Sequence, residues 1–310
     1  MAIKFNKEPD LKTPVLFCGW PGIGNIGIIA IDTLRGVLRA EKFAEIESWE
    51  FFNPRKVIIE NGLLRDLEFP LNRFYYRRLV GQDVLFFIGQ EQTSEHRAGY
   101  AEGEKAYRLG NLVLDVAERF GCRRIFTSGA AVAQIHHTHK PRVWAVPSNA
   151  KLIAEIKAYP NTILMSDLEH RGGAGSITGL NGLMLGLAQK RGFDAICLMG
   201  EVPYYLQGAP WPYPKASLSV LEVITRYLTL QLEFKKLDEL TRQVERNVED
   251  FVQKLFATPG LPEQIKDEIA RLAEEPNADL GPITDEEQKR MMDRLDELFN
   301  QGDISNDRPV

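Results

Sequence analysis

Apolar residues in the first 230 positions form short runs that alternate with longer amphipathic segments. Segments with apolar residues three or four positions apart predict helices over 25–38, 98–120, 149–158, 177–190 and 214–230. The short runs predict strands over 13–19, 43–51, 56–60, 72–80, 83–89, 124–128, 142–146, 162–165 and 194–199. Strands that alternate with helices favour a mainly parallel or mixed sheet covered on both faces. The sequence therefore predicts an α/β fold, a three-layer sandwich.

Beyond position 231 the pattern becomes helical. One apolar stripe recurs at spacings of three and four; its members are Leu237, Leu240, Val244, Val248, Phe251 and Leu255. Such a stripe fits a helix packed on its own domain or a coiled-coil-like contact with another subunit. Residues 259–262, PGLP, end this helix. A short helix is predicted to follow, and a last helix is predicted over 284–299.

The charge is unevenly distributed and suggests a boundary. Residues 231–310 contain 20 acidic and 11 basic side chains, a balance of −9, whereas the whole chain carries −5. The first 230 residues therefore carry +4. We predict an α/β domain over residues 1–235 and an acidic helical extension over 236–310.

The composition restricts the location and the partners of the protein. The sequence has no apolar run of membrane-spanning length, and its first residues are polar, unlike a signal peptide. The three cysteines are scattered, which favours buried thiols in a reducing cytoplasm. A net charge of −5 argues against nucleic-acid binding. We expect a cytoplasmic protein with neither a membrane nor a nucleic-acid partner.

Residues 18–27, CGWPGIGNIG, carry the spacing Gly22-x-Gly24-x-x-Gly27 of a dinucleotide-binding turn. Trp20-Pro21 stand between the predicted strand and the first of these glycines, and proline lacks an N–H donor. A P-loop is excluded because no Gly-Lys-Ser/Thr follows. The turn either presents free amides to an anion or lets a helix pack closely on a sheet. For this motif alone, packing is the favoured interpretation.

Other small-residue segments follow predicted strands and widen this picture. A second glycine-rich turn over 172–182 leads into a helix, and residues 127–130 and 200–201 follow two further strands. Ligands of open α/β sheets bind at the carboxyl ends of strands. We therefore predict a ligand crevice lined by Gly22, Gly24, Ser128, Gly173, Gly175, Ser176 and Glu201.

Signatures of metal binding and of catalysis are incomplete. His136, His137 and His139 lie close in sequence, but no cysteine or carboxylate neighbours them, so we interpret them as part of a polar loop. No GxSxG nucleophile elbow occurs. We therefore assign no metal site and no catalytic residue. Trp211 and Tyr213 lie on a proline-stiffened loop and are our candidates for contact with a partner.

Several segments, in order, resemble the proteasome assembly chaperone 2 family. They are residues 19–27, 128–130, 179–185 and 212–216, and the resemblance spans residues 14 to about 235. Tyr213 stands where this family often has an acidic residue. Similar proteins have been labelled ATP-grasp enzymes, but we find no paired carboxylates suited to magnesium and no nucleotide-gripping lysine, so we predict no cofactor.

The resemblance implies a three-layer fold similar to nucleoside phosphorylases and self-association into homo-oligomers. Eukaryotic members of the family escort proteasome α subunits, and archaeal relatives look like proteasome-binding chaperones. Some of them end in a hydrophobic-Tyr-x tail that docks on the α ring; this sequence ends Arg308-Pro309-Val310, without the tyrosine. We therefore expect a non-catalytic assembly chaperone or scaffold whose partners are itself and proteasome subunits or another protein complex. The alternative is a small-ligand binder or a phosphorylase- or hydrolase-like enzyme that uses the glycine-lined crevice.

Overall fold

A nine-stranded mixed sheet forms the centre of the molecule in the computed structural model, which describes residues 2–93, 103–164, 167, 175–258 and 263–274. The strand order is β1-β3-β6-β7-β2-β8-β11-β9-β10. The four central strands, β7, β2, β8 and β11, are parallel, whereas both flanks contain antiparallel pairs. The strands of the sheet are β1 (Ile3–Phe5), β2 (Val15–Gly19), β3 (Glu41–Ile46), β6 (Asn72–Arg77), β7 (Val84–Gly89), β8 (Arg124–Ala133), β9 (Val143–Pro147), β10 (Thr162–Leu164) and β11 (Asp194–Pro203).

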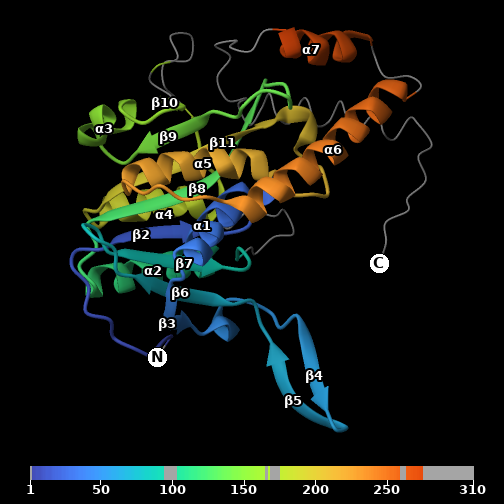
Figure 1. The fold of residues 1–310 in the computed structure, drawn as a ribbon. Coiled ribbons are helices and arrows are strands. Elements are labelled where there is room, and N and C mark those ends of the chain that lie inside the picture. Colours follow the sequence, from blue (N-terminus) through green and yellow to red (C-terminus); the bar gives the residue numbers. More distant parts are fainter. Residues whose placement is uncertain (1, 94–102, 165–166, 168–174, 259–262, 275–310) are drawn as a thin grey trace.

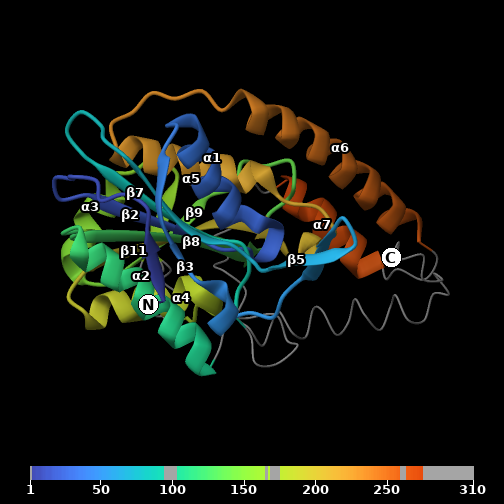
Figure 2. The same ribbon diagram turned by 90° about the horizontal axis from the view of Figure 1, so that it is seen from below.

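Helices cover both faces of this sheet, so the predicted three-layer α/β sandwich is confirmed (Figures 1 and 2). One face carries α1 (Ile26–Val37), α3 (Ile153–Lys157) and α5 (Pro214–Tyr227). The opposite face carries α2 (Gly103–Arg119) and α4 (Gly179–Lys190). Central strands such as β2 are buried on both faces, which explains why they are apolar throughout rather than alternating.

Strands β8 and β11 continue beyond the ends that the sequence predicted. Predicted to end at 128 and 199, they run to Ala133 and Pro203 and stay paired in parallel, with Gly200 opposite Ala130 and Glu201 opposite Ala131. The small residues that we interpreted as loops are thus ladder positions. The placement of Ser128 and Glu201 at strand ends was wrong, because glycine and alanine weaken the strand signal without preventing pairing.

Two further strands were not predicted, and two were predicted too long, one of them over 72–80 where β6 ends at Arg77. β1 and β5 (Leu63–Glu68) have no counterpart in the prediction, and the strand predicted over 43–51 ends at Ile46. β5 pairs with β4 (Lys56–Glu60) in a separate two-stranded sheet. In Figure 1 this hairpin extends away from the sandwich as an arm.

The acidic extension begins with two helices that pack on the α1/α5 side. Helix α6 (Lys235–Ala257) buries its apolar stripe in the same hydrophobic cluster as α1 and α5, and α7 (Glu263–Glu274) adds Ile265, Ile269 and Leu272. The apolar stripe of α6 therefore packs on its own chain, which is the first of the two interpretations. The predicted helix over 284–299 and the first residues of the one over 98–120 lie outside the described residues. No helix among those described is both long and apolar enough to cross a membrane.

Candidate functional site

The glycine motif of residues 22–27 is used for close packing. Gly24 adopts φ +57°, and a Cβ there would lie 2.9 Å from Cβ of Tyr213, whose N–H donates to the Gly24 carbonyl over 2.8 Å. A Cβ on Gly27 would lie 2.0 Å from the carbonyl oxygen of Ser128. Only glycine allows α1 to approach β8 and the loop before α5 so closely. These contacts agree with the packing interpretation at Gly24 and Gly27, whereas a Cβ on Gly22 would meet no atom of the described residues within 4 Å.

Gln92 connects this motif to the second glycine-rich turn. Its Nε2 donates to the Pro21 carbonyl over 2.5 Å, and its Oε1 accepts from the N–H of Leu180, 2.9 Å away in the first turn of α4. Gly175 and Ser176 lie just before α4 and are exposed. Gly173 lies outside the described residues. Sequence reasoning missed Gln92, because a lone glutamine after a strand has no distinguishing pattern.

Ser128 and Glu201 do not face a common crevice. Alternation along β8 puts Ser128 on the same face as Phe126, in the cluster under α1 and α5, and its buried Oγ has no hydrogen-bond partner among the residues that the structure describes. Along β11, Glu201 shares the opposite face with Met199, beside Trp144. The two side chains are therefore separated by the sheet.

Glu201 is a fully buried carboxylate whose oxygens are already occupied. They accept from the backbone N–H of Arg142 (2.8 Å), from its Nε (3.1 Å) and Nη2 (2.9 Å), and from Nε1 of Trp144 (2.9 Å). The guanidinium neutralises the buried charge, and the other donors satisfy its remaining lone pairs. Glu201 thus joins β11 to β9 and is not free to act as an acid or a base.

The two partner-contact candidates lie under helix α6. Tyr213 is 5% exposed, and the ring of Trp211 stacks edge-on against Phe251 of α6, with centroids 5.6 Å apart. Burial raises the pKa of Tyr213. Both aromatics therefore make contacts inside the chain, and α6 occupies the surface that the sequence suggested they display.

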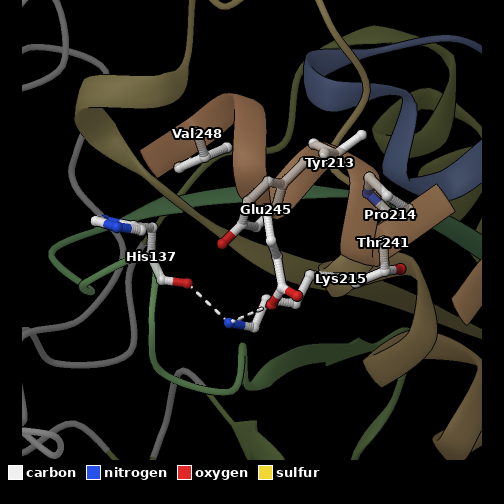
Figure 3. A pocket seen from close by; sticks show the side chains of 8 residues that line it. His137, Tyr213, Pro214, Lys215, Thr241, Glu245 and Val248 are labelled. Atoms are coloured by element: carbon white, nitrogen blue, oxygen red, sulfur yellow. Dashed lines mark hydrogen bonds and ion pairs between the residues drawn. The ribbon is translucent and has the colours of Figure 1, made fainter. Parts of the chain in front are cut away.

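Polar contacts fasten α6 to the histidine-rich loop between β8 and β9. The Nζ of Lys215, in the first turn of α5, donates to the carbonyls of His137 (2.8 Å) and Thr138 (3.1 Å) and pairs with Glu245 of α6 at 3.1 Å (Figure 3). A small hollow is lined by His137, Lys215 and Glu245 together with Tyr213, Pro214, Thr241, Val244 and Val248. One lysine thus connects three segments.

His137 adds a second connection; it lies in the predicted polar loop, and its side chain is buried. Tyr205 Oη lies 2.9 Å from both the backbone nitrogen and Nδ1 of His137, and Nε2 lies 3.2 Å from Glu249 of α6. The carboxylate of Glu249 can only accept, so Nε2 of His137 carries a proton and donates it. Because burial lowers the pKa of His137, the imidazole is neutral, and Nδ1 accepts from the hydroxyl of Tyr205.

The electrostatics of this chain of groups argue for a structural role. Burial lowers the pKa of His137 despite the opposing effect of Glu249, and burial raises the pKa of Tyr205. The pKa of Glu249 is lowered by the hydrogen bond from His137. Tyr205 and His137 are both buried, so neither presents a reacting atom to solvent, and their hydrogen bonds connect the loop after β8 to Glu249 of α6. In the sequence, this contact of α6 with the loop after β8 is indicated only by two glutamates one helical turn apart, Glu245 and Glu249.

The histidines make a testable contribution to the pH dependence of stability. Burial and then the neighbouring His137 and His139 lower the pKa of His136 to about 4 from 6.5. Because the unfolded chain takes up this proton at a higher pH than the folded chain, His136 contributes stability that is complete above pH 6.5 and is lost as the pH falls toward 4. Because solvent screens this partly exposed ring, the expected loss is below the full value of the shift, about 2 kcal/mol in the free energy of unfolding. Urea unfolding at pH 7.5 and 4.5 should show a smaller difference for His136→Gln than for the wild type, and equal differences would contradict this.

Comparison with known proteins agrees with this architecture. A sequence model of the PAC2 family matches residues 16–252, which include most of α6. A protein of Methanocaldococcus jannaschii described as uncharacterized, MJ1210, is 26% identical over 243 residues, covering 78% of this chain and 84% of that protein. The description of MJ1210 states no function.

Three solved structures share this fold, and this chain aligns with nearly the whole length of each of them. PbaB of Pyrococcus furiosus, described as an archaeal proteasome activator, has 29% identity and a TM-score of 0.66, covering 80% of this chain and 97% of PbaB. A PAC2 family protein from Streptomyces avermitilis has 21% identity and a TM-score of 0.62, covering 84% and 99%. P. furiosus PbaA, described as an archaeal homolog of proteasome-assembly chaperone, has 19% identity and a TM-score of 0.59, covering 80% and 96%. Together with the match over residues 16–252, these likenesses place the chain: it belongs to the PAC2 family.

Proposed function

We propose that this chain is a non-catalytic scaffold that acts as a homo-oligomer and binds proteasome particles, assisting their assembly or activity. The observation that carries the proposal is the likeness to PbaB, a proteasome activator by its description, at 29% identity over 97% of that protein. Likeness over a whole domain supports a shared mode of action better than a shared fold alone does.

The chemistry of the described residues supports a binding role over catalysis. Glu201 is saturated by donors, and Ser128 is buried on the other side of the sheet. The cysteines are free and buried, and burial raises the pKa of Cys197 to about 11, which keeps its thiol protonated and unreactive. Buried, reduced cysteines also suit the cytoplasm, where we place the protein. The crevice-based alternative would need groups that converge on one space.

The proposal is tested by mixing the full chain with proteasome core particles purified from its own host. Native mass spectrometry should then detect a complex of an oligomer of this chain with the core particle, and peptide hydrolysis by the particle should change. A variant that ends at residue 274 keeps α6 and α7, whose apolar residues belong to the core, so it separates a contribution of residues 275–310 from loss of folding. An oligomer that never joins the particle but carries a stoichiometric small molecule would contradict the proposal and favour the crevice alternative.

A further inference from the structure

The dipeptide Asn-Gly occurs twice in the chain, in two very different environments. Asn61-Gly62 forms the tip of the arm, between β4 and β5, whereas Asn181-Gly182 lies in the first turn of α4. A leucine follows in both places. The side-chain amide of an asparagine reacts most readily with the next backbone nitrogen when glycine follows, because glycine has no side chain to hinder that nitrogen. The local sequence makes both copies reactive, so only the fold distinguishes them.

The tip of the arm leaves the first copy accessible. Asn61 and Gly62 are exposed, and a Cβ on Gly62 would meet no atom of the described residues within 4 Å. Both have positive φ, +53° and +78°, as the two-residue turn of a hairpin requires. The strand pairing ends at Glu60 and Leu63, and no described residue forms a hydrogen bond with the Gly62 N–H or with the Asn61 side chain.

The arm can rearrange around its tip at a low cost in free energy. Of the described strands, only β4 and β5 belong to its sheet, which extends away from the sandwich (Figure 1). A two-stranded hairpin is marginally stable in water, and segments with few buried contacts open first. A bulge between Ile58 and Ile59 further interrupts the pairing. The Gly62 nitrogen can therefore approach Cγ of Asn61 while the sandwich stays folded.

The second copy is held by helix α4. Gly182 is the fourth residue of α4, so its N–H donates to the carbonyl of the N-cap residue, Thr178. A Cβ on Gly182 would lie 2.1 Å from the carbonyl oxygen of Ile177, because the chain before α4 packs directly on this glycine. Asn181 is 7% exposed, and its backbone carbonyl accepts from Oγ1 of Thr127 over 3.2 Å. Reaction at Asn181 therefore requires local unfolding of α4.

We propose that Asn61 is a site of spontaneous covalent modification in the folded protein, and that Asn181 is protected from the same reaction. The backbone nitrogen of Gly62 loses its proton to water or hydroxide and attacks Cγ of Asn61. The new N–Cγ bond closes a cyclic imide, and the Cγ–Nδ2 bond breaks to release ammonia. Water then opens the imide at one of its two carbonyls and gives aspartate or isoaspartate, in which the backbone runs through Cγ. The sum is amide and water giving acid and ammonia, without an oxidant or a further reactant.

The modification changes both the charge and the shape of the arm. Either product adds one negative charge beside Glu60, whose carboxylate pairs with Arg65. Isoaspartate also inserts a methylene into the backbone of a two-residue turn, which then no longer closes the pairing of Glu60 with Leu63 in the same register. We expect the arm to lose its pairing as the modification accumulates. The inference goes beyond the proposed function and depends on neither an oligomer nor a partner.

The test incubates the full chain at pH 8.5 and follows both asparagines by peptide mass spectrometry. The peptide that contains Asn61 should gain the mass difference between a hydroxyl and an amino group at least about 10-fold faster than the peptide that contains Asn181. In guanidinium chloride, which removes both environments, the two rates should become similar because glycine and leucine follow each asparagine. The matched control is Asn61→Gly, which keeps a favourable hairpin turn but has no side-chain amide. Its arm should stay unmodified, and its Asn181 should react as in the wild type.

A second measurement detects the imide and its consequence. Hydroxylamine attacks the imide and cleaves the chain there, so the folded wild type should yield fragments 1–61 and 62–310, whereas Asn61→Gly should stay intact. After long incubation, backbone amides of residues 56–68 should exchange hydrogen faster in the wild type than in Asn61→Gly. Equal modification of Asn61 and Asn181 in the folded protein, modification of Asn61 only after unfolding, or equal hydrogen exchange of the two incubated arms would overturn the inference.

Discussion

Gly27→Ala should destabilise the protein by more than about 3 kcal/mol, although alanine favours a helix over glycine by about 1 kcal/mol. The added Cβ would lie 2.0 Å from the carbonyl oxygen of Ser128, in the backbone of β8. A strand in the centre of the sheet cannot move aside, so α1 must separate from it and its buried residues lose packing. The free energy of unfolding from urea titration, followed by circular dichroism, measures this loss.

The matched control lies in the same helix. A Cβ on Gly36 meets no atom of the described part of the chain within 4 Å, so Gly36→Ala should raise the free energy of unfolding by about 0.5–1 kcal/mol through helix propensity alone. Equal stabilisation by the two substitutions would mean that α1 does not lie as close to β8 as the structure places it. The packing role of the glycine motif would then be wrong.

Glu201→Gln should cost about 3–5 kcal/mol, the usual cost of removing one partner from a buried ion pair. The glutamine keeps the shape of the side chain but puts a neutral amide among donors that need a carboxylate, and the guanidinium of Arg142 loses its counter-charge. The single amide oxygen cannot replace both carboxylate oxygens, so either Nε1 of Trp144 or the backbone N–H of Arg142 loses its acceptor in the interior. The midpoint of urea unfolding should fall accordingly.

An exposed ion pair provides the comparison. Glu222 accepts from Lys140 over 2.6 Å, but both side chains are about half exposed. Glu222→Gln should therefore change the free energy of unfolding by less than about 1 kcal/mol. An equally small change in the free energy of unfolding for Glu201→Gln would mean that Glu201 is not a buried junction between β9 and β11. Glu201 would then again be a candidate for an acid or a base.

The sequence determined the architecture because that architecture follows from local patterns. Alternation of apolar runs with amphipathic segments predicted most strands and helices of the α/β sandwich, and Pro214 indicated where α5 begins. The ordered motifs from residue 19 to residue 216 indicated the family that the comparison over 16–252 confirmed. Patterns of this kind depend on neighbouring residues alone, so they can be read without knowing what lies across the sheet.

Tertiary structure decided what the individual candidates do. Ser128 and Glu201 seemed to share an edge, yet strands β8 and β11 continue past them and their side chains point to opposite faces. Tyr213 seemed displayed, but it packs on Gly24 beneath α6, and His137 is buried by contacts with Tyr205 and Glu249, 68 and 112 residues away in the chain. Burial and partnership are set by which distant segments meet. A local pattern records which side chains are present, and only the packed fold fixes what they face.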